Sequence, residues 1–211
     1  VGPQVHVMKY DPGAPLHLRY EIAHDFVNAE EWQTLANMCL TINSFFAWDF
    51  NSCESLRQDG VFLPIDFANA CPDSQVTSLH YHFPWLVKAK LKWAIFVAAT
   101  RRKMRRNLAW DPFFEIAATE APFKEKLTSY ARLAHQLFES DRFAEFCAEH
   151  LPHIDEVTWE FFGSDVAKDA VRQKVTALFP AHEIDEFTEH FWQRVQLWRQ
   201  KEERFSHGPA S

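Results

Sequence analysis

The spacing of apolar residues changes near Thr77, and this change limits the folds open to the chain. Before Thr77, apolar and polar residues alternate in short runs, and a period of two is typical of half-buried strands. After Thr77, apolar residues recur every three or four positions, which predicts helices. The sequence therefore indicates an α+β protein. The predicted strands cover residues 4–10, 16–23, 45–56 and 61–67.

One helix is expected between the two pairs of strands. Asn28 stands where a helix N-cap would, and two glutamates follow in the first turn, where acidic groups favour the helix dipole. The Asp59-Gly60 pair is a turn signal between the last two strands. We therefore predict a small antiparallel sheet, in the order strand-strand-helix-strand-strand, flanked by helices and followed by a mainly helical C-terminal region. The corresponding domains are residues 1–100 and 101–211.

Helix-start signals divide the second half of the chain. Pairs such as Asp111-Pro112 and Ser140-Asp141 mark helix N-termini. We expect helices over residues 83–105, from 111, from 122, from 140, and over 153–162, 165–178 and 183–204. The last of these has one apolar face, made by Ile184, Phe187, Phe191, Val195 and Trp198.

The composition is that of a globular protein and excludes a nucleotide site built from a glycine loop. Apolar residues make up 47% of the 211 residues and charged residues 24%, which is unlike a disordered chain. Only 5 residues are glycine, and neither GxGxxG nor GxxxxGK[ST] occurs. A nucleotide bound here would therefore need groups other than a Walker or Rossmann loop.

Cysteine usage indicates a reducing compartment. Cys39, Cys53, Cys71 and Cys147 form no CxxC pair and have no regular spacing, which is typical of buried free thiols. The apolar run at 93–99 is far shorter than the ~20 residues of a membrane span. We therefore expect a cytoplasmic protein with no membrane partner.

Polar side chains gather at the predicted hairpin. Glu54 on one strand, and Asp66 and Asn69 on its partner, present oxygen atoms that can converge on one cation. Mg²⁺ prefers oxygen ligands and needs only one or two protein carboxylates. Glu54 opposes Asp66 only with a three-residue loop or a β-bulge, whereas a tight two-residue turn sets Cys53 opposite Asp66. The alternative is that Asp66, Asn69 and Asp73 are turn formers and caps after a strand.

The segment FNSCESLRQDGVFLPIDFANACPDSQ, residues 50–75, resembles the C-terminal strand hairpin of ATP-grasp carboxylate–amine ligases. The resemblance implies that Glu54, Asp66 and Asn69 hold the Mg²⁺ ions that bridge the phosphates of ATP. The spacing Asp-Phe-Ala-Asn departs from the Glu-x-Asn that is commoner in the family.

The same resemblance assigns roles to two basic residues of the first strands. It implies that Lys9 and Arg19 are the catalytic and cofactor-binding groups that approach the phosphates or the acyl-phosphate. The plain alternatives are an edge-strand position for Lys9 and an ion pair with Glu21 or Asp11 for Arg19. The reaction implied is phosphoryl transfer from ATP to a carboxylate, followed by attack of an amine or a thiol.

The first subdomain of such a ligase has no counterpart in this sequence. Its nucleotide-clamping lysines and glycine-bearing loop are missing, and the sequence begins with Val1 rather than Met. We therefore expect these residues alone to be inactive. The expected partners are the missing N-terminal subdomain or a second copy of the chain as a homodimer, with small-molecule carboxylate and amine substrates for the intact enzyme.

A basic segment stands out against the net charge of −7. Residues 74–110 contain no acidic residue and eight basic ones, which are Lys88, Lys90, Lys92, Arg101, Arg102, Lys103, Arg105 and Arg106. Such a segment attracts a nucleotide, an acidic substrate or an acidic partner, or it is a solvated helix end. Nucleic acid is a disfavoured partner because the overall charge is acidic and no reader motif accompanies the segment.

The spacing of the histidines gives only weak support for a metal site. On a strand His80 and His82 share a face, but no third and fourth ligand stands nearby, so a structural or substrate-contacting pair is favoured over zinc. His182, Glu186 and His190 lie four residues apart without the second motif that a di-iron bundle needs. The rival to the ligase hypothesis is a non-catalytic helical protein-interaction module, consistent with 20 Phe, 8 Trp and 4 Tyr.

Overall fold

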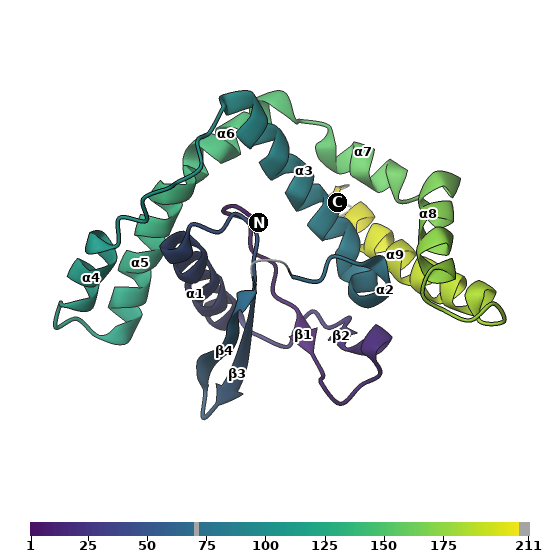
Figure 1. The fold of residues 1–211 in the computed structure, drawn as a ribbon, viewed down its shortest axis with the longest axis horizontal. Helices are drawn as coiled ribbons and strands as arrows, with labels where there is room; N and C mark the ends of the chain where they lie inside the picture. The colour runs from purple at the N-terminus through teal and green to yellow at the C-terminus, as the bar shows by residue number, and fades with distance from the viewer. Residues whose placement is uncertain (70–71, 207–211) are drawn as a thin grey trace, which may run out of the picture. The chain divides into compact units, whose positions relative to one another are not determined.

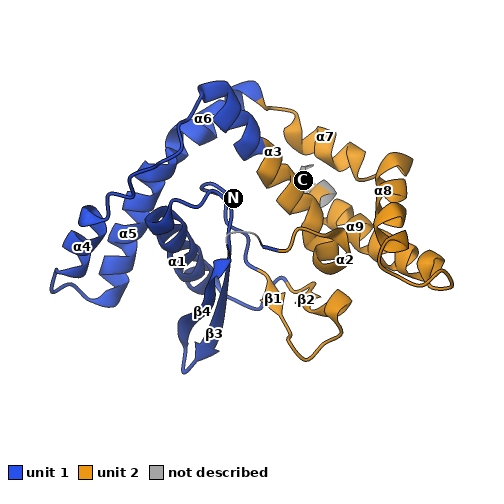
Figure 2. Cartoon of the chain, in the orientation of Figure 1, with its two compact units in different colours: residues 1–7, 24–72, 92–150 blue, residues 8–23, 73–91, 151–211 orange. Residues whose placement is uncertain are grey.

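The computed structural model describes residues 1–69 and 72–206, with side chains described up to residue 202, and it has the predicted α+β class (Figure 1). The chain divides into two compact units (Figure 2). Unit 1 contains residues 1–7, 24–72 and 92–150, and unit 2 contains residues 8–23, 73–91 and 151–211. The predicted boundary near residue 100 falls inside unit 1. Helix α3 (Phe83–Thr100) supplies its first half to unit 2 and its second half to unit 1.

Unit 1 combines one hairpin with four helices of its own. The elements are α1 (Ala29–Phe46), β3 (Ser52–Gln58), β4 (Val61–Asn69), α4 (Asp111–Ala117), α5 (Phe123–Phe138) and α6 (Ser140–His150). Helix α1 begins as predicted, because the Asn28 side chain accepts a hydrogen bond from the backbone N–H of Glu31. The Glu31 carboxylate accepts one in return from the backbone N–H of Asn28, both at 2.9 Å, which completes a capping box.

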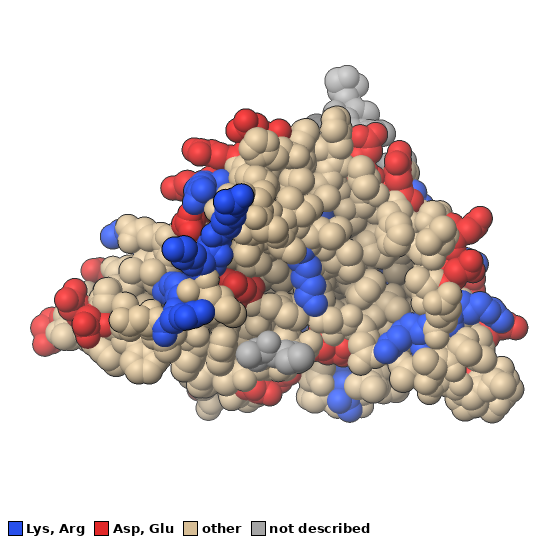
Figure 3. Space-filling view, turned by 45° about the horizontal axis from the view of Figure 1, so that its top comes forward, with Lys and Arg blue, Asp and Glu red and all other residues tan. Residues whose placement is uncertain are grey.

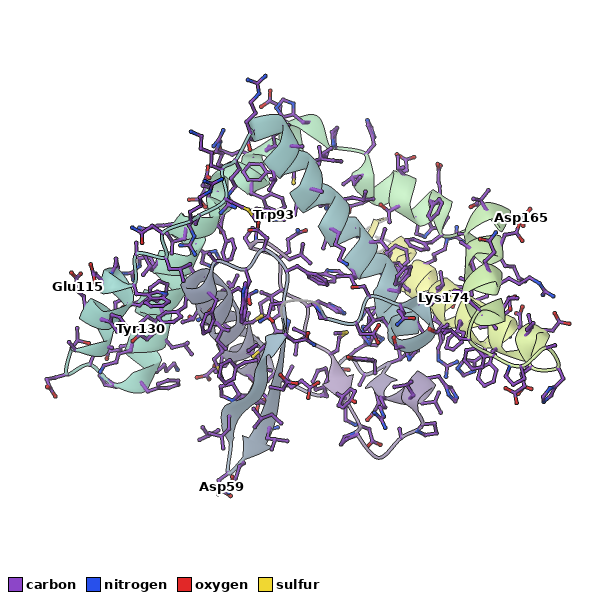
Figure 4. The ribbon with its side chains drawn as sticks, in the orientation of Figure 1. Asp59, Trp93, Glu115, Tyr130, Asp165 and Lys174 are labelled. Carbon is purple, nitrogen blue, oxygen red and sulfur yellow. The ribbon has the colours of Figure 1, made fainter. Side chains whose placement is uncertain are left out.

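The β3–β4 hairpin turns over two residues. Asp59 and Gly60 both have left-handed backbones, with φ of 51° and 78°, as a two-residue hairpin turn requires. Gln58 and Val61 therefore face each other as the first pair of an antiparallel ladder. Figure 4 shows Asp59 at the tip of this hairpin.

The core of unit 1 is aromatic. The rings of Trp93 and Phe96 on α3 contact Phe143 on α6, at centroid distances of 5.5 and 5.4 Å. Gly2 lies against the Trp93 ring so closely that a Cβ atom there would stand 2.4 Å from it. The first residues of the chain are therefore held against α3 by a contact that only glycine permits.

Unit 2 is built around the last helix. Its elements are β1 (Lys9–Tyr10), η1 (Leu16–Leu18), β2 (Tyr20–Glu21), α2 (Val76–Leu79), η2 (His80–His82), α7 (Ile154–Phe161), α8 (Asp165–Thr176) and α9 (Ile184–Ser206). The predicted apolar face of α9 is confirmed, because Phe191, Val195 and Trp198 are buried while Ile184 and Phe187 pack against the same core. That core joins α9 to α8 through Val175.

The strands differ from the prediction in length and in association. Residues 16–23 form a 3-10 turn followed by a two-residue strand. Pro15 has no backbone N–H to donate to a strand ladder, and its carbonyl accepts a hydrogen bond from the backbone N–H of Leu18 at 2.8 Å, which closes the turn. β3 begins at Ser52 rather than near 45, because α1 continues to Phe46. Within residues 1–69 and 72–206 the result is two separate two-stranded antiparallel sheets, β1–β2 in unit 2 and β3–β4 in unit 1, instead of one sheet.

Candidate functional site

Glu54 and Asp66 lie directly opposite each other in the β3–β4 ladder. The two-residue turn alone would set Cys53 opposite Asp66, because the pairs nearest the turn follow a regular register from Gln58 and Val61 to Ser55 and Pro64. A β-bulge between Glu54 and Ser55 shifts the register by one residue. The sequence allowed this alignment with either a three-residue loop or a β-bulge, and the structure produces it with a β-bulge behind a two-residue turn.

The two carboxylates lie on the open face of the hairpin. The other face is turned to α1, since Arg57 forms an ion pair with Glu31 and covers the ring of Phe62 at 5.8 Å. Alternation along β3 places Glu54 on the opposite face from Arg57. Both Glu54 and Asp66 are exposed, and neither has an ion-pair partner among the residues that the structure describes.

Asn69 extends the polar group along β4. It pairs with Ser52 and is half-buried, and a second register shift separates this pair from the carboxylate pair. The neighbouring Asn51 is buried, and its side-chain amide donates to the Phe67 carbonyl at 3.0 Å. Asp73 has a different role: it accepts hydrogen bonds from the backbone of Gln75 and from the Ser78 hydroxyl. Of the two roles considered for the acidic residues of this segment, metal ligand or turn former and cap, the second one fits Asp73.

The donor set of the hairpin fits a hard cation. Two carboxylates and one amide oxygen match Mg²⁺, which fills its other positions with water or phosphate oxygens. In the described residues there is no group of three or more His, Cys, Asp or Glu side chains placed to hold a metal.

Thiol ligation at the hairpin is disfavoured. Burial raises the pKa of Cys53 to about 12, and the Cys39 thiol and the carboxylates of Asp66 and Glu54 add to the effect. Cys53 therefore remains a protonated thiol at neutral pH. Cys39, Cys53 and Cys147 form no disulfide, as predicted. They are partly buried, whereas the prediction was full burial. Cys71 lies outside the described residues.

Lys9 and Arg19 belong to unit 2 and have partners there. The Lys9 ammonium forms an ion pair with its cross-strand neighbour Glu21 at 2.9 Å. Arg19 donates to the carbonyl of Ala14 at 3.1 Å and to the hydroxyl of Tyr10 at 3.3 Å. These contacts give both side chains a structural role in the β1–β2 segment, while the predicted metal ligands belong to unit 1. Their assignment to phosphate binding stays a prediction.

The basic segment is divided between structural and exposed side chains. Lys88 forms ion pairs with Asp155 and Glu202, each at 3.1 Å, within unit 2. The exposed members after α3 are Arg101, Lys103 and Arg106, which fit the solvated helix end that was one alternative. Figure 3 shows Lys and Arg side chains gathered over the segment that follows α3.

Arg102 and Arg105 satisfy the carbonyl groups at two helix ends of unit 1. Arg102 donates to the Leu137 carbonyl in the last turn of α5 at 3.0 Å, and Arg105 donates to the Ser44 carbonyl in the last turn of α1. Helix ends leave such carbonyls without intrahelical partners, and a cation also suits the helix dipole there. Sequence reasoning missed this role, because both partner carbonyls are distant in sequence.

A pocket of about 260 Å³ lies beside these two arginines in unit 1. Trp48 and Phe50 line it together with Arg102 and Arg105, and Asp49 adds an acidic group. The Arg102 guanidinium lies 3.3 Å from the Asp49 carboxylate, so one of the two guanidinium charges that line the pocket is paired with a carboxylate there.

The His80-Tyr81-His82 motif forms a buried 3-10 turn rather than a strand. The His80 and His82 ring centroids are 6.3 Å apart and tilted by 38°, and His82 Nε2 lies 3.0 Å from the Glu21 carbonyl. The pair therefore has structural contacts, which agrees with the favoured alternative to zinc. On α9 and before it, His182 is exposed beside Glu183, whereas His190 is half-buried.

Comparisons with protein-family models, with curated proteins and with solved structures find no match for this chain. Within the described residues, no helix joins the length and the apolar character needed to cross a bilayer. We therefore infer function from the geometry of Glu54, Asp66 and Asn69.

Proposed function

We propose that the β3–β4 hairpin binds a divalent cation and that the chain supplies the metal-binding part of an ATP- and Mg²⁺-dependent carboxylate–amine (or thiol) ligase of the ATP-grasp type. The observation that carries the proposal is the direct opposition of Glu54 and Asp66 on an open face. A bulge creates this opposition although two like charges facing each other destabilise a ladder.

A bound cation would offset the repulsion between the two carboxylates. Mg²⁺ between the two carboxylates replaces repulsion with attraction, and Asn69 adds a neutral oxygen from the same strand. Because the face is open, the remaining coordination positions stay available to phosphate oxygens of a nucleotide.

The chemistry proposed is phosphoryl transfer. When bound, Mg²⁺ neutralises the charge that develops on the transferred phosphoryl oxygens. Glu54, Asp66 and Asn69 would hold the ion in place. A role for Lys9 and Arg19 in phosphate binding is proposed from the resemblance alone, since both have partners within unit 2. The groups that clamp the nucleotide base are expected from an upstream subdomain.

Cation binding by the chain itself is the direct test. Titration with Mn²⁺, followed by calorimetry and by electron paramagnetic resonance of the free ion, should show one site in the unaltered chain. Glu54→Gln and Asp66→Asn should each weaken binding at least about tenfold, which is ~1.4 kcal/mol. Asp59→Asn removes a carboxylate from the tip of the same hairpin and should leave binding unchanged. Equal binding by all four proteins would contradict the proposal.

A second candidate function is a non-catalytic interaction module. The face that carries Glu54 also carries Leu56, which is 57% exposed, and its cross-strand partner Leu63, which is 43% exposed. Both hairpin strands are edges among the described residues, and free edges favour pairing with a second copy of the chain. Sedimentation of the unaltered chain and of a Leu56→Gln, Leu63→Gln variant distinguishes the two functions. A dimer lost in this variant, together with no cation binding, would favour the module.

A further inference from the structure

Unit 1 carries a pocket and a basic surface that the proposed metal site does not use. The pocket, of about 260 Å³, lies where α1 and α5 end and where the segment after α3 passes them. Its apolar walls are Trp48, Phe50, Met104, Leu137 and Phe138. The segment 101–106 supplies one of these walls and also carries three exposed cations, which we call the basic rim: Arg101, Lys103 and Arg106.

The charged groups that line the pocket already have partners within unit 1. The Arg102 guanidinium lies 3.3 Å from the carboxylate of Asp49 and 3.4 Å from that of Glu139. Arg105 donates a hydrogen bond to the Ser44 carbonyl at the end of α1. A group that enters the pocket therefore meets mainly aromatic and aliphatic walls. The volume of 260 Å³ is below the roughly 300–1,000 Å³ of sites for small molecules, so it suits a single apolar side chain.

The basic rim, in contrast, is not engaged by the chain. No hydrogen bond or ion pair joins the side chains of Arg101, Lys103 or Arg106 to any residue that the structure describes. Residues 74–110 include no acidic residue, so the neighbouring sequence supplies no counterion. Lys and Arg side chains gather over this segment in the space-filling view (Figure 3). Three solvated cations within six residues attract a group of negative charges.

The occupant of this surface must combine negative charge with a group that fills an apolar pocket. A single-stranded nucleic acid carries an unbroken row of phosphates and follows a basic groove over several nucleotides. Here the free cations are confined to six residues, and the side chains of Asp49 and Glu139, 42% and 36% exposed, repel phosphates beside the pocket. A peptide can place its carboxylates away from these two groups, and it is therefore the better match.

We propose that the pocket and the basic rim bind an acidic peptide segment of a partner protein, whose one large apolar side chain enters the pocket while its carboxylates pair with the rim. The apolar side chain supplies most of the affinity, because groups that fill a desolvated pocket dominate the binding energy of an interface. The exposed charge pairs accelerate association and fix the register of the peptide. This surface is separate from the proposed cation site, since Glu54, Asp66 and Asn69 do not line the pocket.

Selection of binding peptides from a random library displayed on phage, with the full chain as the bait, tests the proposal. The enriched peptides should carry several acidic residues around one leucine or aromatic residue. The most enriched peptide is then synthesised with a fluorescent label and titrated by fluorescence anisotropy. Lys103→Gln combined with Arg106→Gln should weaken its binding at least about tenfold. Replacing the apolar residue of the peptide by serine should weaken binding to a similar extent.

A variant at the pocket tests the anchor from the side of the protein. Met104 lines the pocket and is 84% exposed, so Met104→Glu adds a negative charge there without removing a buried group. It should also weaken binding of the peptide. The matched control is Lys124→Gln combined with Arg132→Gln, which removes two exposed cations of α5 and should leave binding unchanged. Glu54→Gln should leave it unchanged as well, so failure of this proposal is distinguishable from failure of the metal site.

Three results would overturn the proposal. The first is a selection that enriches no peptide, or only peptides without acidic residues. The second is equal binding of the selected peptide by the Lys103, Arg106 variant and by its matched control. The third is tighter binding of a labelled oligouridine than of the selected peptide, with the same dependence on Lys103 and Arg106, which would identify a nucleic acid as the occupant.

Discussion

The side-chain amide of Asn51 donates hydrogen bonds to Asn43 Oδ1 at 2.9 Å and to the Phe67 carbonyl at 3.0 Å. Asn43 is on α1 and Phe67 is on β4, so one buried amide joins the helix to the strand that carries Asp66. The bulged part of the hairpin is held in place by this link, since buried polar groups that lose their partners destabilise the fold.

Replacing Asn51 should therefore destabilise unit 1. Asn51→Ala leaves the buried Asn43 Oδ1 without its donor and removes the hydrogen bond to the Phe67 carbonyl, and we expect a loss of about 1–3 kcal/mol in the free energy of unfolding. Urea unfolding followed by circular dichroism measures this loss. Gln33→Ala removes the exposed hydrogen bond to Asn37 and should change stability by at most about 0.5 kcal/mol. Equal effects of the two substitutions would show that Asn51 has no special role.

The opposed carboxylates predict a gain of stability when one of them is neutralised. In the presence of EDTA, Asp66→Asn should raise the free energy of unfolding by about 0.2–1 kcal/mol, because it removes a facing pair of like charges. Added Mg²⁺ should stabilise the unaltered chain but not this variant. Thermal unfolding in both buffers tests the prediction, with Asp59→Asn as the control. Stabilisation of Asp66→Asn by Mg²⁺ to the same extent as the unaltered chain would refute it.

Acid should destabilise unit 2 through its histidines. The pKa values of His80 and His190 fall to about 3 and about 4 in the folded chain, from an ordinary value of 6.5. Between the folded pKa values and 6.5, the unfolded chain binds more protons than the folded chain. The stability that the neutral histidines contribute is therefore fully present above pH 6.5 and is lost as the pH falls towards 3. Each group contributes a slope of up to about 1.4 kcal/mol per pH unit.

The charged groups near the His80 ring also favour its neutral form, and so they add to the loss of stability in acid. His17, His82 and Arg194 surround His80, and none of them is acidic. Urea unfolding of the unaltered chain and of His190→Gln at several values between pH 4 and pH 7 isolates the contribution of His190. The variant should show the shallower dependence on pH. Parallel curves would mean that His190 titrates normally in the folded chain.

Arg102 should be essential for stability and not replaceable by lysine. Its side chain is 10% exposed, it lies between Asp49 and Glu139, and it covers the Trp93 ring at 5.0 Å. Arg102→Gln should lower the free energy of unfolding by about 3–5 kcal/mol, because it removes one partner of a buried charge pair. Arg102→Lys should recover only part of the loss, because an ammonium lacks the planar fork that reaches several acceptors.

Arg101, the neighbour of Arg102 in sequence, provides the matched control. Arg101 is exposed, and Arg101→Gln should change the free energy of unfolding by at most about 0.5 kcal/mol. Chemical unfolding of the three variants compares them directly. Similar losses for Arg101→Gln and Arg102→Gln would show that the contacts of Arg102 do not stabilise unit 1.

The elements with local signals were predictable. The Asn28 N-cap, the Asp59-Gly60 turn and the apolar face of α9 all depend on residues close together in sequence, and the structure confirms them. The early strands were overestimated because alternation near Pro15 resembles a strand, while the ladder that a strand needs depends on distant partners. The position of Glu54 opposite Asp66 was predictable only as one of two alternatives.

The sequence by itself determined the class of the fold, the order of its elements and the residue types available at the hairpin, because period, caps and turns act over a few residues. Only the tertiary structure decided that a bulge aligns Glu54 with Asp66, that the four strands form two sheets, and that His80 meets α9. These outcomes depend on packing between segments that are far apart in the chain, and no local pattern encodes that packing.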